Sequence, residues 1–200
     1  MRQPHRMVAA IGLALVSCPS GAEAHLVTTG LGPLYDGLLH AALTPEDLVP
    51  VLALALLAGL RGVTHGRRAL FVLPVAWLLG GLIGLAVHGG VSPRWTALSF
   101  VLLGGLVAAD ARLSLGATTL LAALLGLGHG YLNGSALAQP GLGAVELLGI
   151  VAAVFTLVAL GASFVVPLRA VWARVVVRVA GSWIAAIGLL LVGWAIRSGA

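Results

Sequence analysis

The sequence predicts an all-helical membrane protein, a bundle of six transmembrane helices that follows a cleaved signal peptide. Two properties of the chain support this prediction: 60% of its 200 residues are hydrophobic and only 8% are charged. A soluble domain does not need so much apolar surface, whereas several spans of about 20 residues do. The apolar residues also fall into runs separated by glycine, proline and arginine, which is the pattern of a polytopic membrane protein.

Residues 1–24 are typical of a secretory signal peptide. Two arginines and a short apolar segment precede Ala22-Glu23-Ala24, a small-x-small cleavage site. Cleavage there makes His25 the mature N-terminus and removes Cys18, so that disulfide and thiolate–metal chemistry are excluded from the mature chain. The alternative is that the segment ending in Cys18 is a lipoprotein box, with Cys18 as a lipidated first residue.

Residues 25–200 are expected to form a single transmembrane helical domain, because no long linker or internal repeat divides them. A short interfacial helix, with Asp36 and His40 on one face, is expected before the first span. The six predicted spans cover residues 45–60, 69–87, 95–109, 113–131, 145–166 and 175–196.

The arginines predict the orientation of these spans. Seven of them fall in loops on one side of the predicted bundle, whereas only Arg94 and Arg197 fall on the other side. The positive-inside rule then predicts a multi-pass protein of the bacterial inner (cytoplasmic) membrane with its mature N-terminus outside. The net charge of +5 does not indicate a nucleic-acid partner, because aromatic residues are few and the arginines lie in short loops. The expected partner is the lipid bilayer.

This orientation places most histidines and carboxylates of the mature chain at the exported face. Imidazole and carboxylate together suit a borderline divalent ion such as nickel, cobalt or zinc. The sequence therefore predicts a metal-capture site that draws on seven residues: His25, Asp36, His40, Glu46, Asp47, His129 and Asn133.

Some of these residues have a second interpretation. Thr44 suits a helix N-cap, and acidic residues in the first turn that follows it favour the helix dipole, so capping alone could explain Glu46 and Asp47. His129 lies near the end of a predicted span, and Asn133 follows one helical turn later on the same face. The alternative for His129 is a hydrogen bond to a neighbouring helix, with the glycines around it allowing close packing.

These residues and the order of the spans resemble the HupE/UreJ family of membrane proteins, which is associated with nickel or cobalt uptake for hydrogenase and urease. Members resemble this chain in a signal peptide that ends just before a histidine, and most carry the motifs HPxxGxDH at the first span and HGxAHG at the end of the fourth. The second motif stands here as the segment from His129 to Gly134, and the run from Arg178 to Leu190 resembles the family's closing RxxGxxIAxxGxxLL pattern.

The chain departs from the family motifs at metal-ligating positions. When His40 is aligned with the first histidine, Glu46 replaces the aspartate and Asp47 replaces the second histidine. Asn133 replaces the second histidine of HGxAHG. Oxygen-rich sites suit harder ions, so these changes put nickel selectivity in question and indicate a divergent member.

The resemblance implies a membrane permease for a divalent transition-metal ion, nickel or cobalt before others, with the ion as transported substrate and no permanently bound cofactor. It also implies maturation proteins of hydrogenase or urease as partners. The chain lacks HExxH, GxSxG and GxxxxGK[ST] motifs, so we expect no enzyme activity. Two alternatives are a non-transporting accessory protein for metalloenzyme assembly and a haem-binding electron-transfer subunit with His88 and His129 as axial ligands.

Overall fold

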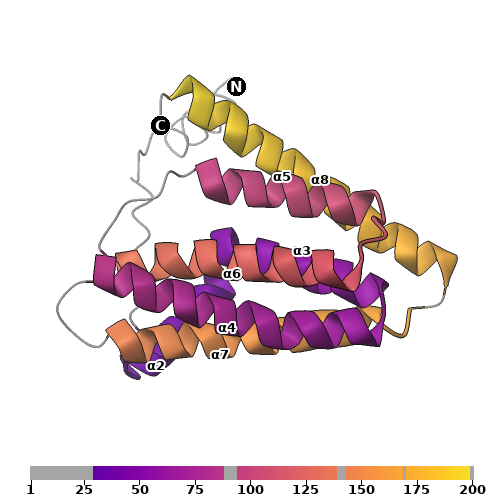
Figure 1. Ribbon diagram of the computed structural model, residues 1–200. Coiled ribbons are helices and arrows are strands. Elements are labelled where there is room, and N and C mark those ends of the chain that lie inside the picture. Colours follow the sequence, from indigo (N-terminus) through magenta and orange to yellow (C-terminus); the bar gives the residue numbers. More distant parts are fainter. Residues whose placement is uncertain (1–28, 88–93, 139–142, 169, 199–200) are drawn as a thin grey trace, which may run out of the picture.

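The computed structural model describes residues 29–87, 94–138, 143–168 and 170–198, and helices are the only regular structure within these ranges. Figure 1 shows their arrangement. The all-helical prediction is therefore confirmed. The predicted signal peptide, His25 and His88 lie outside the described residues. In chain order the helices are α2 (Pro33–Leu43), α3 (Pro45–Leu60), α4 (Val63–Val87), α5 (Arg94–Ala108), α6 (Leu115–Ala136), α7 (Gly143–Val165) and α8 (Val171–Arg197).

Four of these helices, α4, α6, α7 and α8, are long and apolar enough to cross a membrane. Helices α2 and α3 are long and apolar enough to cross a membrane only when they are taken together. They are bent by 68° at the break between them, and counting the pair as one span raises the number of candidate spans to five. Helix α5 has 15 residues, about 23 Å of helix against a hydrocarbon core of about 30 Å. The described chain thus has four to five candidate spans, and crossings by α3 alone and by α5 stay predictions.

The helix ends explain where two polar residues lie. Helix α6 continues five residues past Tyr131, the predicted end of the span, and so includes Asn133 on the same face as His129. Helix α4 begins six residues earlier than predicted and includes His65, whose Nδ1 lies 2.9 Å from Thr118 Oγ1 of α6. Thr44 is the N-cap of α3, as predicted, although its side chain makes no capping hydrogen bond.

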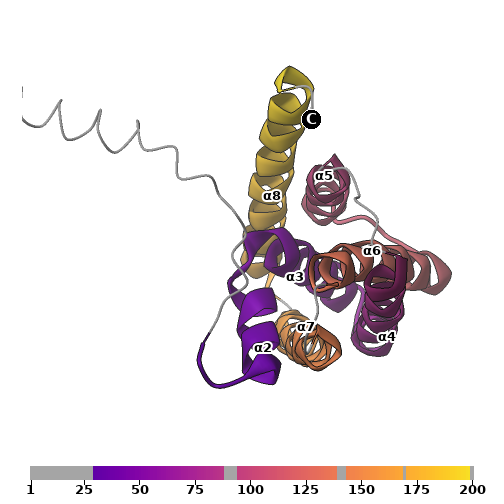
Figure 2. The same ribbon diagram turned by 90° about the vertical axis from the view of Figure 1, so that its left-hand side faces the viewer.

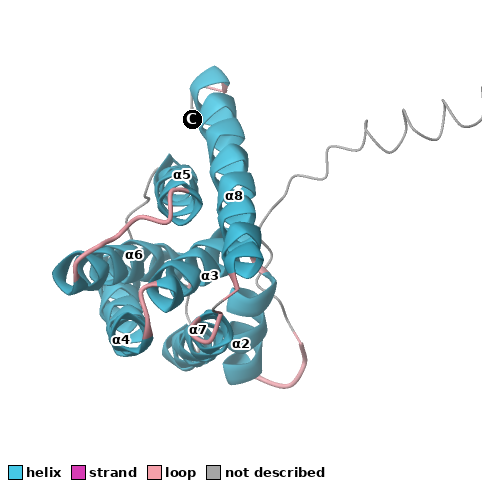
Figure 3. Cartoon of the chain, turned by 90° about the vertical axis from the view of Figure 1, so that its right-hand side faces the viewer, coloured by secondary structure: helices cyan, strands magenta, loops and turns pink. Residues whose placement is uncertain are grey.

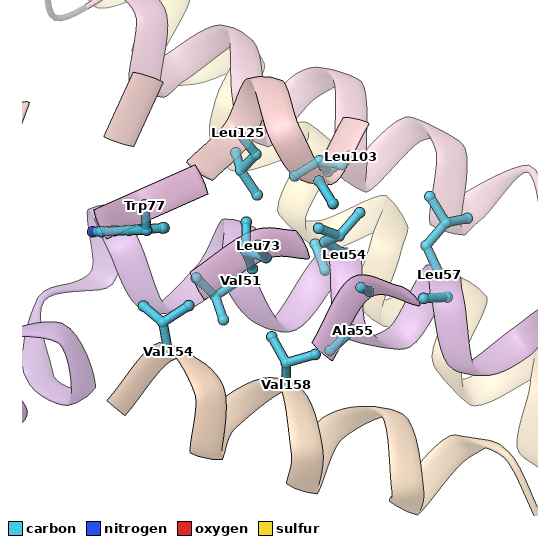
Figure 4. Packing of buried hydrophobic residues seen from close by; sticks show 14 of the residues in the cluster. Val51, Leu54, Ala55, Leu57, Leu73, Trp77, Leu103, Leu125, Val154 and Val158 are labelled. Carbon is cyan, nitrogen blue, oxygen red and sulfur yellow. The ribbon is translucent and has the colours of Figure 1, made fainter. Parts of the chain in front are cut away.

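The helices pack in two parts. Helix α3 lies among α4, α6 and α7, and α2 covers α7, whereas α5 and α8 pair with each other along one side of the molecule (Figures 2 and 3). The apolar core fills the space around α3. Figure 4 shows core side chains that come from α3, α4, α5, α6 and α7, respectively Leu54, Leu73, Leu103, Leu125 and Val154.

Glycines bring α4 and α6 into backbone contact. A Cβ added at Gly126, Gly130 or Gly134 of α6 would lie 2.6, 2.1 or 2.0 Å from a backbone oxygen of α4. These glycines recur every four residues and therefore share one helix face. Small residues at such spacing let membrane helices approach closely, so the glycines around His129 do form a packing surface, as one interpretation of the sequence held.

Candidate functional site

Asp47 is the centre of a buried polar cluster. It lies in the first turn of α3 and is only 4% exposed. One carboxylate oxygen, Oδ1, is 3.0 Å from His129 Nδ1 of α6, and the other, Oδ2, accepts a hydrogen bond of 2.9 Å from Asn133 Nδ2. A buried carboxylate is costly unless it is paired and hydrogen-bonded. Both of its oxygens are satisfied here by one face of α6.

His129 is buried and contacts side chains of α3, α4 and α5. It is 1% exposed, and its ring lies 5.5 Å from the Trp77 ring, centroid to centroid. Its Nε2 is 3.2 Å from Ser99 Oγ of α5, and that hydroxyl also lies 2.7 Å from the Thr96 carbonyl, to which it donates. A hydroxyl has a single proton. When Ser99 donates to Thr96, Nε2 must therefore be the donor to Ser99.

Both the oxygen and the nitrogen of the Asn133 side-chain amide make hydrogen bonds. Its Oδ1 accepts a hydrogen bond of 3.1 Å from Trp77 Nε1, while its Nδ2 donates to Asp47. The orientation of the amide is therefore determined, because the indole can only donate and an ionised carboxylate can only accept. The chain of contacts from Trp77 through Asn133 to Asp47 connects α4, α6 and α3.

His40 approaches the same cluster from α2. It is buried, and its Nε2 lies 3.8 Å from Asp47 Oδ2, which is an ion pair only when the imidazole is protonated. The structure thus brings together four of the seven predicted ligands: His40, Asp47, His129 and Asn133.

The other predicted ligands are not part of this cluster. Asp36 accepts hydrogen bonds from the backbone N–H and the hydroxyl of Thr29, at 2.6 and 2.5 Å. Glu46 is exposed at the start of α3, where it fits the helix-dipole interpretation. His25 lies outside the described residues.

No three His, Cys, Asp or Glu side chains among the described residues are grouped closely enough to hold a metal ion. In the cluster, Asp47 and His129 bind each other rather than facing a common empty position. The donor types fit a borderline divalent ion, but coordination would require the carboxylate and the imidazole to turn away from one another. The structure therefore shows Asp47 and His129 paired with each other, and the metal-capture site stays a prediction.

A second polar cluster lies at the other end of α3, about 21 Å from Asp47 at 1.5 Å per residue. Asp110, directly after α5, pairs with Arg61 after α3 and with Arg174 of α8, the latter at 2.9 Å. Burial and the neighbouring Arg174 and Arg112 lower the pKa of the Arg61 guanidinium from its ordinary value. The Asp110 carboxylate supplies the opposite charge and joins three helix ends.

Sequence reasoning missed three residues that contact or adjoin the site. Trp77 and Ser99 lie within apolar runs, and only the indole N–H and the hydroxyl mark them as polar. Glu146, in the first turn of α7, is not among the predicted ligands. Its Oε1 is buried and has no hydrogen-bond partner among the described residues. The available signal for Trp77 was its i, i+4 relation to Gly81, which places both on the glycine-contacted face of α4.

Comparison with protein families gives one match relevant to this geometry. The model of the HupE / UreJ protein family matches residues 13–191. No curated protein and no solved structure matches the chain significantly. The family match includes all helices that carry the cluster, and it confirms the resemblance drawn from the motifs. Because it covers most of the 200 residues, the chain belongs to the HupE/UreJ family of membrane proteins.

Proposed function

We propose that this chain is an inner-membrane permease that captures a divalent transition-metal ion, nickel or cobalt, on the exported face. HupE/UreJ proteins are transporters rather than enzymes and are linked to nickel and cobalt uptake. The observation that supports a role for this chain's own residues is the contact between Asp47 and His129, a carboxylate and an imidazole buried between α3 and α6. Ionisable groups within membrane helices are costly and indicate function by default.

The proposed site consists of Asp47, His129, His40 and Asn133. Imidazole nitrogen and carboxylate oxygen are suitable ligands for nickel and cobalt, and the Asn133 amide orients the Asp47 carboxylate through its Nδ2. When the ion arrives, it replaces the contact between Asp47 and His129: the imidazole releases the proton that faces the carboxylate, and both groups then bind the cation instead of each other. When the ion leaves, the pair closes again, which keeps both buried groups satisfied between transport cycles.

Two of the remaining predicted ligands, His25 and Asp36, belong to the approach in this proposal, whereas Glu46 is left with the helix-dipole role. His25, as a mature N-terminus, would offer an amine and an imidazole together, and Asp36 lies on α2 before His40. No nucleotide-binding motif is present in the sequence, so the transport energy comes from an ion gradient or from a partner. Maturation proteins of hydrogenase or urease are the partners that the family association suggests.

Uptake of radiolabelled nickel, cobalt and zinc by cells that express the chain tests this function. The variant Asp47→Asn keeps the side-chain shape and removes the charge, and it should abolish uptake. The neighbouring Glu46→Gln is the matched control, because it removes a carboxylate that is exposed and outside the cluster. Wild-type uptake equal to that of cells carrying an empty vector, for all three metals, would refute the proposal.

A second variant separates metal binding by His129 from a packing role. On the binding interpretation, His129→Ala abolishes metal-dependent uptake while folded protein remains in the membrane. On the packing interpretation, it lowers stability and abundance, by roughly 0.6–2 kcal/mol per lost interhelical hydrogen bond. Uptake that scales only with the amount of folded protein would remove His129 from the transport path.

A further inference from the structure

Two buried polar atoms near the site have no hydrogen-bond partner within the described structure: His40 Nδ1 and Glu146 Oε1. A third such atom, Arg61 Nε, lies at the other end of α3. Most buried polar groups in proteins are satisfied, and each exception calls for an explanation such as a bound ion or water. The free-energy cost of leaving such a group unpaired is about 1–3 kcal/mol. His40 Nδ1 and Glu146 Oε1 are a nitrogen and an oxygen ligand, the two types that a borderline divalent ion takes.

The packing of α2 on α7 brings the two side chains to the same interface. A Cβ at Gly37 of α2 would lie 1.9 Å from the Glu146 backbone oxygen, and a Cβ at Gly149 of α7 would lie 2.1 Å from the Leu34 backbone oxygen. Backbone contact at two points fixes the first turns of α7 against α2. His40 follows Gly37 by three residues and so lies on the same side of α2. Glu146 lies near enough to Asp36 and His40 to interact with them electrostatically.

His40 connects this interface with the buried pair. Its Nε2 points toward Asp47 Oδ2, 3.8 Å away, which leaves the orphaned Nδ1 on the opposite part of the ring. Asp36 does not compete for the same role, because Thr29 occupies its Oδ1 with two hydrogen bonds. The imidazole of His40 therefore turns one nitrogen toward Asp47 and keeps the other buried without a partner among the described residues.

We propose that Glu146 and His40 Nδ1 form an outer binding position for the transported divalent cation, through which the ion passes before it reaches Asp47 and His129. This inference rests on the proposed function and adds Glu146, which no family motif includes, to the path. Two protein ligands, with water completing the shell, bind an ion weakly. Weak binding suits a transit position, since an ion that moves through must leave each site as readily as it enters.

The test compares the KM and the maximal rate of nickel uptake in cells expressing wild type, Glu146→Gln, Glu146→Asp and Thr156→Val. Glu146→Gln keeps the shape and removes the charge, and it should raise KM by about tenfold, a loss typical of groups around a metal site. Glu146→Asp keeps a carboxylate and should recover part of the affinity. Thr156→Val, on the exposed face of α7, is the control and should leave both parameters unchanged.

The outcomes distinguish this inference from the proposed function. If wild type takes up nickel and Asp47→Asn does not, but Glu146→Gln has the wild-type KM, the outer position is refuted and the permease stands. Equal KM values for the Gln and Asp variants, both above wild type, would show that the residue acts through packing and would also refute it. If wild type transports no metal, both proposals fail together. Folded protein in each membrane preparation, measured by size-exclusion chromatography, normalises the rates.

Discussion

The contact between α4 and α6 predicts that Gly130→Ala destabilises the protein. The added Cβ would lie 2.1 Å from the Trp77 backbone oxygen, whereas ordinary contact begins at 3.4 Å, so that the two helices must separate by about 1.3 Å (3.4 − 2.1). Overpacking of this kind costs about 1–3 kcal/mol. The same shift would stretch the bond from Trp77 to Asn133, now 3.1 Å, beyond hydrogen-bond distance, at a further cost of about 0.6 kcal/mol.

An opposing effect makes the experiment informative. Replacing a mid-helix glycine by alanine stabilises the helix by about 0.5–1 kcal/mol, so the net effect of Gly130→Ala is a loss of roughly 1–3 kcal/mol. At Gly193 of α8 nothing lies within 4 Å of an added Cβ, and Gly193→Ala should show the stabilising effect alone.

Thermal unfolding of detergent-solubilised protein measures both variants under one condition. The midpoint should fall for Gly130→Ala and should stay level or rise for Gly193→Ala. Nickel uptake should also fall for Gly130→Ala, because Trp77 and Asn133 position Asp47. A variant Gly130→Ala as stable as wild type would contradict the close approach of the two helices and, with it, the positioning of the site.

Three further predictions test other features. Asp110→Asn removes only the charge between two arginines, because asparagine tolerates the φ of +49° at this position. The variant should lower the free energy of unfolding by about 1–3 kcal/mol. An unchanged unfolding midpoint would mean that the ion pairs contribute nothing. Asn133→His places a second imidazole beside Asp47 and should tighten nickel binding in titrations of solubilised protein, whereas a packing role predicts no gain in affinity and some loss of stability. A cysteine at position 67 should resist an impermeant thiol reagent in intact cells and one at 139 should react; the reverse labelling would overturn the predicted orientation.

Much of the fold could be predicted from the sequence because membrane helices have a strong local signal. Apolar runs bounded by Gly, Pro and Arg located α3 and α5 within one residue at each end and α7 within two. The predicted end of α6 at Tyr131 is five residues too early, since the helix continues to Ala136. Buried glycines are tolerated there because α4 packs directly against them.

The candidate site could be predicted only in part. The sequence indicated that His129 and Asn133 share a helix face and that Asp47 belongs to the same end of the bundle, and these three do meet. It could not separate Asp47 from its neighbour Glu46, because the direction in which a first-turn side chain points depends on the helix packed against it. Glu146 remained unassigned for the same reason, since only the contact between α2 and α7 places it near His40.

The sequence by itself thus determined the all-helical membrane class, the helical segments and the family. It also indicated the end of the molecule at which most histidines and carboxylates gather. Hydropathy and motif spacing carry this information because they are properties of the chain along its length. Only the tertiary structure decided which polar groups pair: Asp47 with His129, Asn133 with Trp77, and Asp110 with two arginines. Such pairs form between helices far apart in sequence, and helix packing through glycine contacts sets which side chains come within bonding distance.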